Sequence, residues 1–228
     1  MICMNTGRCD NLLACIKQAG RRTCLAVVLL MVVPLSGECE DDPIAKDGWT
    51  LIEATATVRI YHRNVAGSSI PWTMIVTTFD APPERVHAVV MDYDHFSEFI
   101  PNVFRSRLVA NVGDTQWVFQ HLHFHGPIAD RVYLIKSSTR KCWSRKHCYR
   151  VEWALDNRPF PDIDLSSGIQ PDVFSGFWEL TSAGNPNTTE GHYAVHSEPG
   201  GFIPSWLVTG MTDRYIQQVV QAVRQRLE

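Results

Sequence analysis

Three histidines alternate with apolar residues in His121-Leu122-His123-Phe124-His125, which is the clearest chemical signal in the chain. In a β-strand, side chains two residues apart point to the same side, so these imidazoles would share one face. Imidazole binds metals and polar ligands. A cupin-like metal site at His121 and His123 would also need an acid and a further histidine. Asp130 is the acid at the matching distance, but no later histidine motif fits. We predict no metal and no cofactor, with His125 in a turn; the cupin-like site is the alternative.

Arg131 opens the next strand-like stretch and shares strand parity with Tyr133. If its guanidinium points inward, burial requires an acidic partner or an anionic ligand head group. If it points outward, Arg131 is an ordinary surface residue, and the sequence leaves both readings open. The sequence contains no nucleophile-elbow, phosphate-loop or dinucleotide motif. We therefore predict no catalytic residues and a binding protein rather than an enzyme.

The N-terminal segment 1–38 has the pattern of an export signal. Arg21 and Arg22 precede an apolar run, residues 25–35, and the small residues Ser36 and Gly37 follow it. The run is shorter than the roughly 20 residues that a membrane-spanning helix needs. We expect the mature protein to be exported, either periplasmic or secreted; a membrane anchor formed by the N-terminal segment is the alternative.

Cys142 and Cys148 are the two cysteines inside the expected mature domain, and they flank a polar tip between two strand-like stretches. In an oxidising compartment this spacing predicts a disulfide across a hairpin. A pair of cysteines alone makes a poor zinc site, because such a site needs four ligands.

Composition restricts the partners that the protein can have. The chain has 228 residues, of which 45% are hydrophobic and 20% charged, and its net charge is −3. We expect no nucleic-acid binding, because such proteins carry a basic surface. No break in composition separates two domains, so residues 48–228 are predicted to form one domain and the protein a monomer.

The expected elements are two strands, a short helical pair, six antiparallel strands and a long C-terminal helix. The helical pair follows from Pro82-Pro83-Glu84 and an apolar stripe after it. Alternating apolar residues predict the strands at 54–62, 72–79, 105–111, 116–125, 131–138, 149–155, 176–181 and 191–197. The last helix repeats apolar residues every three or four positions from Val208 to Leu227. Gly210 within it indicates a close approach by another group.

Three stretches, in this order, resemble the START and polyketide-cyclase-like superfamily. They are Phe-Asp-Ala-Pro-Pro-Glu-Arg-Val at 79–86 with its continuation to 102, Pro-Ile-Ala-Asp-Arg-Val at 127–132, and Gly-Gly-Phe-Ile-Pro-Ser-Trp-Leu-Val at 200–208. One departure is Val132, where the family commonly has an acid. The resemblance implies an α+β helix-grip fold: a curved antiparallel sheet wrapped around the C-terminal helix, with the helical pair after the second strand. It also implies a tunnel that shields a lipid.

The aromatic residues of the strands fit such a cavity, because ligand pockets are mostly apolar. We predict binding and transport of an apolar molecule such as a sterol, fatty acid or phospholipid, with transient membrane contact. A cyclase or aromatase using the same cavity is the alternative.

Gly200 and Gly201 would act as a hinge that lets the start of the last helix open and close as a lid, and alanine at both should slow ligand exchange. The predicted ligand-binding residues are Trp117, Phe119, His121, Arg131, Tyr133, Val151, Trp153, Trp178, Tyr193, Trp206, Leu207 and Met211.

Overall fold

The computed structural model describes residues 44–124, 126, 128–141, 148–156 and 158–228, all within the second of two compact units, Asp41–Glu228. A short 3-10 helix, η1 (Ala45–Asp47), precedes the sheet. Nine strands follow: β1 (Thr50–Ala54), β2 (Val58–Arg63), β3 (Trp72–Phe79), β4 (Val103–Val112), β5 (Thr115–Leu122), β6 (Arg131–Lys141), β7 (Cys148–Leu155), β8 (Val173–Ser182) and β9 (Thr189–Glu198). The helices are α1 (Pro83–Val90), η2 (Tyr93–His95), α2 (Phe96–Phe99) and α3 (Ser205–Leu227).

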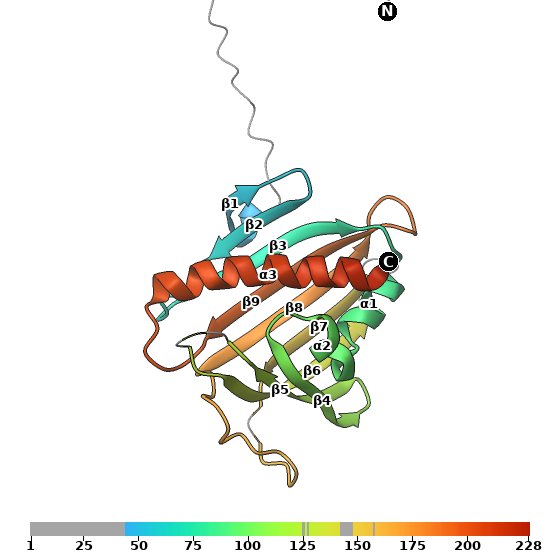
Figure 1. Ribbon diagram of the computed structural model, residues 1–228. Coiled ribbons are helices and arrows are strands. Elements are labelled where there is room, and N and C mark those ends of the chain that lie inside the picture. Colours follow the sequence, from blue (N-terminus) through green and yellow to red (C-terminus); the bar gives the residue numbers. More distant parts are fainter. Residues whose placement is uncertain (1–43, 125, 127, 142–147, 157) are drawn as a thin grey trace, which may run out of the picture. The chain divides into compact units, whose positions relative to one another are not determined.

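The strands form one antiparallel sheet in the order β1-β2-β3-β9-β8-β7-β6-β5-β4. Helix α3 lies across one face of this sheet, and α1 and α2 lie beside it (Figure 1). The predicted α+β helix-grip architecture is confirmed. The helical pair follows the third strand rather than the second, because Thr50–Ala54 forms a separate edge strand. All five residues of β1 are exposed, so no apolar alternation marks it in the sequence.

Helix α3 packs through one apolar stripe, as its periodicity predicts. Its buried residues recur at three- and four-residue spacing from Ile216 to Leu227, and Val208 is buried near its start. The close approach that the sequence predicts at Gly210 is absent, because a β-carbon there would meet no neighbouring atom within 4 Å. The part of the chain that the structure describes holds no helix long and apolar enough to cross a membrane.

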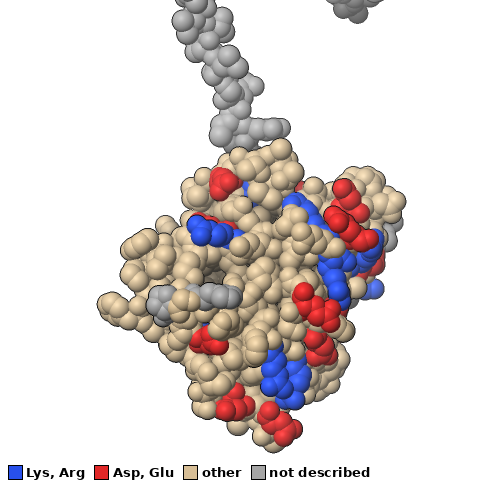
Figure 2. Space-filling model, in the orientation of Figure 1, with Lys and Arg blue, Asp and Glu red and all other residues tan. Residues whose placement is uncertain are grey.

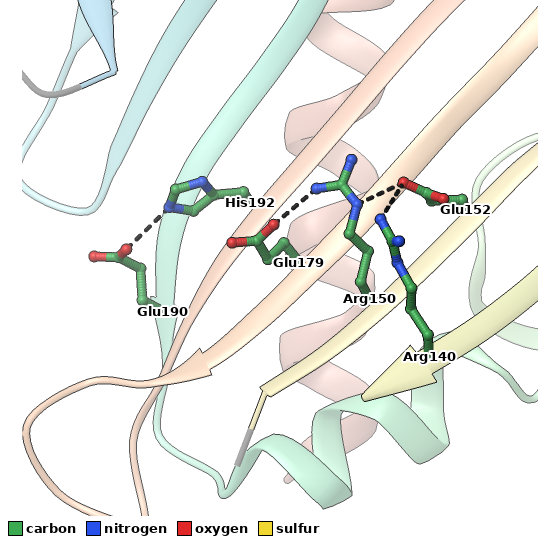
Figure 3. A network of polar contacts seen from close by, with 6 residues as sticks. All are labelled: Arg140, Arg150, Glu152, Glu179, Glu190 and His192. Carbon is green, nitrogen blue, oxygen red and sulfur yellow. Dashed lines mark hydrogen bonds and ion pairs between the residues drawn. The ribbon is translucent and has the colours of Figure 1, made fainter. Parts of the chain in front are cut away.

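The opposite face of the sheet carries charged side chains, whose contacts within and between strands are drawn in Figure 3 with α3 behind the sheet. Arg150 lies between Glu179, at 2.7 Å, and Glu152, at 2.6 Å. Arg150 and Glu179 are directly paired across β7 and β8, so the contact follows from strand register. Both cavities described below lie on the other side of the sheet, beside α3.

Candidate ligand-binding cavities

Two cavities lie between the sheet and the helices. The inner cavity measures about 60 Å³ and the outer cavity about 250 Å³. Phe174 of β8 and Tyr215 of α3 line both cavities, so the two spaces adjoin at these side chains. The inner cavity is otherwise lined by Val90, Tyr93, Phe96, Ile100, Val103, Gln120, Tyr133, Ile135, Trp153, Trp178, Tyr193, Val219 and Val223.

Stacked aromatic rings form the sheet side of the inner cavity. Trp178 and Tyr193 are directly paired across β8 and β9, and their rings stack 4.2 Å apart at an interplanar angle of 12°. Trp153 reaches Tyr193 from β7, with ring centroids 6.0 Å apart. Gly176, opposite Trp153, makes this possible, because its missing side chain leaves room for the indole. Sequence thus positions an aromatic wall through strand register and one glycine.

Tyrosines provide the polar groups of the inner cavity. The Tyr133 hydroxyl donates to Gln120 Oε1 at 3.1 Å, and the Tyr93 hydroxyl bonds Ser137 Oγ at 2.8 Å. Burial raises the pKa of Tyr93 to about 12, and it raises the pKa of Tyr133, Tyr193 and Tyr215 further above the ordinary range. These phenols therefore stay protonated near neutral pH and act as neutral hydrogen-bonding groups.

Arg131 points inward and borders the outer cavity, with only 3% of the residue exposed. Its guanidinium donates to the carbonyl oxygens of Ala129, Pro199 and Gly200, the last at 3.0 Å. No carboxylate of the described residues forms an ion pair with it, and burial lowers the pKa of the guanidinium. The Arg131 side chain thus connects β6 to the Pro199–Gly200 backbone, which precedes α3 in the chain.

The remaining lining of the outer cavity is largely apolar. Met211 of α3 contributes to it as the sequence predicts. The other lining residues are Asn102, Leu122, Phe124, Ile128, Val195, Ser197, Pro199, Ile203, Val208, Thr212, Arg214 and Gln218. A largely apolar lining of this kind favours an apolar ligand.

Three predicted ligand-binding residues lie on the other face of the sheet. Trp117, Phe119 and His121 share one parity of β5, whereas Gln120 and Leu122, of the opposite parity, line the cavities. Trp117 donates its indole N–H to Asp156 at 2.9 Å. The error of parity has a physical cause, because Phe119 is buried too, in a small cluster beneath the loop before β8. These three residues do not border either cavity.

Three further predicted residues are placed as follows. Val151 is fully buried in the main core but borders neither cavity. Trp206 and Leu207, in the first turn of α3, are 74% and 36% exposed and also border neither cavity. By contrast, Tyr133, Trp153, Trp178 and Tyr193 line the inner cavity, so the structure brings these four together with Arg131 and Met211 along one path.

The histidine motif lies with Asp130 on the outer face of the sheet. His121 Nε2 is 2.7 Å from Asp130 Oδ2, and His123 Nδ1 is 3.0 Å from Asp130 Oδ1. Hydrogen bonding to His121 lowers the pKa of Asp130. Within the described ranges, no group of three or more histidine, cysteine, aspartate or glutamate side chains could hold a metal ion. His125 and Cys142 lie outside the described residues; Cys148 begins β7 and is buried.

Among the cavity residues that sequence reasoning missed are Tyr93, Gln120, Phe174 and Tyr215. Phe174 precedes the predicted start of its strand by two residues. Gln120 lies between the aromatic and histidine residues that drew attention to the other parity of β5. Tyr215 belongs to the recognised apolar stripe of α3, and Tyr93 to that of the helical pair, so periodicity could have indicated both.

Solved structures of other proteins share this arrangement of sheet and helices. The STAR-related lipid transfer protein from Xanthomonas axonopodis has a TM-score of 0.70 and 23% identity, covering 79% of this chain and 99% of that one. Human StAR-related lipid transfer protein 5 has a TM-score of 0.67 and 10% identity, covering 79% and 86%. These likenesses establish a START-like fold.

The family assignment rests on sequence. The model of the family described as "Polyketide cyclase / dehydrase and lipid transport" matches residues 79–224, and the chain belongs to this family. A curated relative, an uncharacterized protein of Pseudomonas aeruginosa, is 27% identical over 164 residues, which are 72% of this chain and 78% of the relative.

Proposed function

We propose that the domain binds an apolar small molecule, a lipid of the sterol, fatty acid or phospholipid type, and carries it in the two adjoining cavities. The observation that carries this proposal is the apolar outer cavity of about 250 Å³, which continues at Phe174 and Tyr215 into the inner cavity. Ligand pockets in proteins usually have volumes of about 300 Å³ or more. Movement of the Phe174 or Tyr215 side chain would join the two cavities into one site of about that size. The similar solved structures described above are lipid transfer proteins, which supports this proposal.

Tail burial should dominate the affinity of such a ligand. Each buried methylene contributes about 0.8 kcal/mol, whereas one hydrogen bond to a charged group contributes about 1.5–3 kcal/mol. An alkyl chain of even modest length therefore outweighs its head group. Native mass spectrometry of protein purified from its own host, followed by lipid extraction, should detect a bound apolar molecule. The proposal fails if no fluorescent sterol, fatty acid or phospholipid binds at micromolar concentration.

A cyclase or aromatase of the same family is the second candidate, and it would need an acid–base pair inside the cavity. The inner cavity instead presents four tyrosines whose pKa values are raised by burial. A phenol with a raised pKa is a poor base near neutral pH, since it holds its proton. This chemistry supports binding over acid–base catalysis.

We also propose transient membrane contact through residues 199–212, which include no charged residue. Phe202 and Trp206 are fully and 74% exposed, while Ile203 and Val208 of the same segment line the outer cavity. Figure 2 shows few charged side chains at the end of the molecule where α3 begins in Figure 1. Exposed apolar and indole groups insert at a membrane interface without needing anionic lipids.

Flotation with phosphatidylcholine vesicles tests this contact. Full burial of a large apolar side chain contributes about 1.5–3 kcal/mol, so loss of even part of this at both positions in Phe202→Ser with Trp206→Ser should lower vesicle binding about tenfold. The control is Phe104→Ser, because Phe104 is 67% exposed on another part of the surface. Equal loss in the control, or a wild-type protein that never floats, contradicts the contact. A dimer that dissociates in the double variant would instead identify a second copy as the partner.

Export and the cysteine bond are proposed together. The signal-like segment 1–38 supports export, and the Cys142–Cys148 spacing supports a disulfide in an oxidising compartment. Thiol counting on denatured, non-reduced protein from the native compartment should find neither cysteine free. Two free thiols would count against both proposals.

A further inference from the structure

The indole N–H of Trp153 has no hydrogen-bond acceptor within the described part of the chain. Trp153 is only 8% exposed, and it lines the inner cavity. A buried donor without an acceptor is unfavourable, because water can no longer satisfy it. The Trp153 indole is therefore a buried neutral donor without an acceptor among the described residues.

Two further hydroxyls face the same small space. Tyr193 and Tyr215 line the inner cavity, and no residue of the described ranges hydrogen-bonds their hydroxyls; those of Tyr133 and Tyr93 are already bonded to Gln120 and Ser137. Burial raises the pKa of both Tyr193 and Tyr215, and the nearby Tyr215 hydroxyl raises the pKa of Tyr193 further, so both phenols stay neutral. The polar groups left over include one indole donor and two phenols that can donate or accept.

No charged side chain lines the inner cavity. Two cations border the outer cavity: Arg131, whose hydrogen bonds go to backbone carbonyls, and Arg214, which is exposed. A carboxylate or phosphate in the inner cavity would lose its hydration without gaining an opposite charge. An uncharged oxygen that accepts a hydrogen bond loses far less hydration there, and it matches the donors present.

We propose that the inner cavity binds the polar end of the ligand, an uncharged carbonyl or hydroxyl oxygen, with the indole N–H of Trp153 as the donor and the phenols of Tyr193 and Tyr215 around it. This assignment rests on the proposed lipid-binding function and narrows it to neutral ligands. The apolar part of the ligand then passes Phe174 and Tyr215 into the outer cavity, among Ile128, Ile203, Val208 and Met211. The ligand enters with its oxygen leading.

Three probes of equal chain length separate the chemistry of the polar end: methyl decyl ketone, dodecanoate and dodecane. Their affinities are measured by displacement of Nile red at a pH where dodecanoate is ionised. The wild-type protein should bind the ketone more tightly than dodecanoate. Trp153→Phe keeps an aromatic ring but removes the N–H, so it should weaken ketone binding about three- to tenfold and leave dodecane within about twofold.

Trp117→Phe is the matched control, because the indole of Trp117 donates to Asp156 on the opposite face of the sheet. It should leave all three affinities unchanged. Tyr193→Phe and Tyr215→Phe should each weaken the ketone selectively, which keeps the test decisive if Trp153→Phe folds poorly.

Each result has one meaning. Tighter binding of dodecanoate than of the ketone overturns the neutral-ligand assignment. Equal ketone affinity in wild type and folded Trp153→Phe overturns the role of the indole, as it would if a water molecule alone satisfied the N–H. If none of the three probes displaces Nile red and no fluorescent lipid binds, the proposed function itself fails.

Discussion

The indole of Trp153 covers the backbone of Gly176 so closely that a β-carbon at position 176 would lie 2.3 Å from Cζ2 of the ring. The two residues are directly paired across β7 and β8. The same β-carbon would lie 2.5 Å from the carbonyl oxygen of Ala194 on β9. Glycine at this position therefore fixes where the ring lies at the cavity wall.

Gly176→Ala should destabilise the fold, because the added methyl overlaps both a ring and a strand backbone. Overpacking of this kind costs about 1–3 kcal/mol of unfolding free energy. Gly210→Ala is the control: a β-carbon at Gly210 meets open space in the middle of α3, so alanine should stabilise by up to about 1 kcal/mol. Urea denaturation measures both. A Gly176→Ala variant as stable as wild type would show that Trp153 moves aside without cost.

The strand assignments illustrate what alternation can predict. Trp72–Phe79 was predicted with its exact bounds, since β3 is rich in β-branched and aromatic residues and lies between clear turns. Thr50–Ala54 was missed as a strand because every residue in it is exposed. Alternation of apolar and polar residues indicates that one face of a strand is buried. An edge strand with both faces exposed therefore shows no such pattern.

The face of β5 could not be predicted from alternation alone. Phe119 packs against Val132 and Leu134 on the outer face, where Phe160 and Ile163 of the loop before β8 cover them. The strand is thus apolar on both sides, and its pattern does not say which side meets the helix. Only the position of that loop, a tertiary feature, distinguishes the two parities.

Stability should fall at alkaline pH through the buried tyrosines. The folded state raises the pKa of Tyr93 from 10.0 to about 12. Tyr93 therefore contributes stability that is complete below pH 10 and is lost as the pH rises toward 12, because the unfolded chain ionises first. The loss should approach about 1.4 kcal/mol per pH unit for this residue. In Tyr93→Phe, the fall in unfolding free energy over this window should be shallower by that amount; an unchanged slope contradicts the burial effect.

Met211→Trp should obstruct the outer cavity. Met211 lies half-buried in its lining, and an indole there would take up part of its volume of about 250 Å³. We expect the affinity for a fluorescent lipid to fall about tenfold, a loss of about 1.4 kcal/mol. Leu207→Trp is the control, since Leu207 is exposed and borders neither cavity. Equal affinities in both variants and wild type would place the ligand elsewhere.

Gly200 differs from an ordinary turn glycine in what surrounds it. Its φ is +68°, and a β-carbon would lie 2.8 Å from the carbonyl oxygen of Gln170. Its own carbonyl accepts a hydrogen bond from Arg131. Alanine would therefore strain this loop and weaken its tie to β6. The sequence alone predicts slower ligand exchange from alanine at Gly200 and Gly201, whereas the contacts of Gly200 in the structure predict faster exchange from alanine at that position.

Gly200→Ala should release bound fluorescent lipid faster than wild type and lower the free energy of unfolding by more than about 1 kcal/mol. Gly184→Ala is the matched control, because Gly184 has a φ of +76° but open space around its β-carbon. Gly184→Ala therefore has the energetic cost of a positive φ at alanine, but it lacks both the clash with a carbonyl oxygen and the hydrogen bond to arginine that distinguish position 200. Stopped-flow transfer to acceptor vesicles gives the release rate. If both variants release lipid at the wild-type rate, the Gly200 loop is not the gate, and the ligand leaves the cavities by another route.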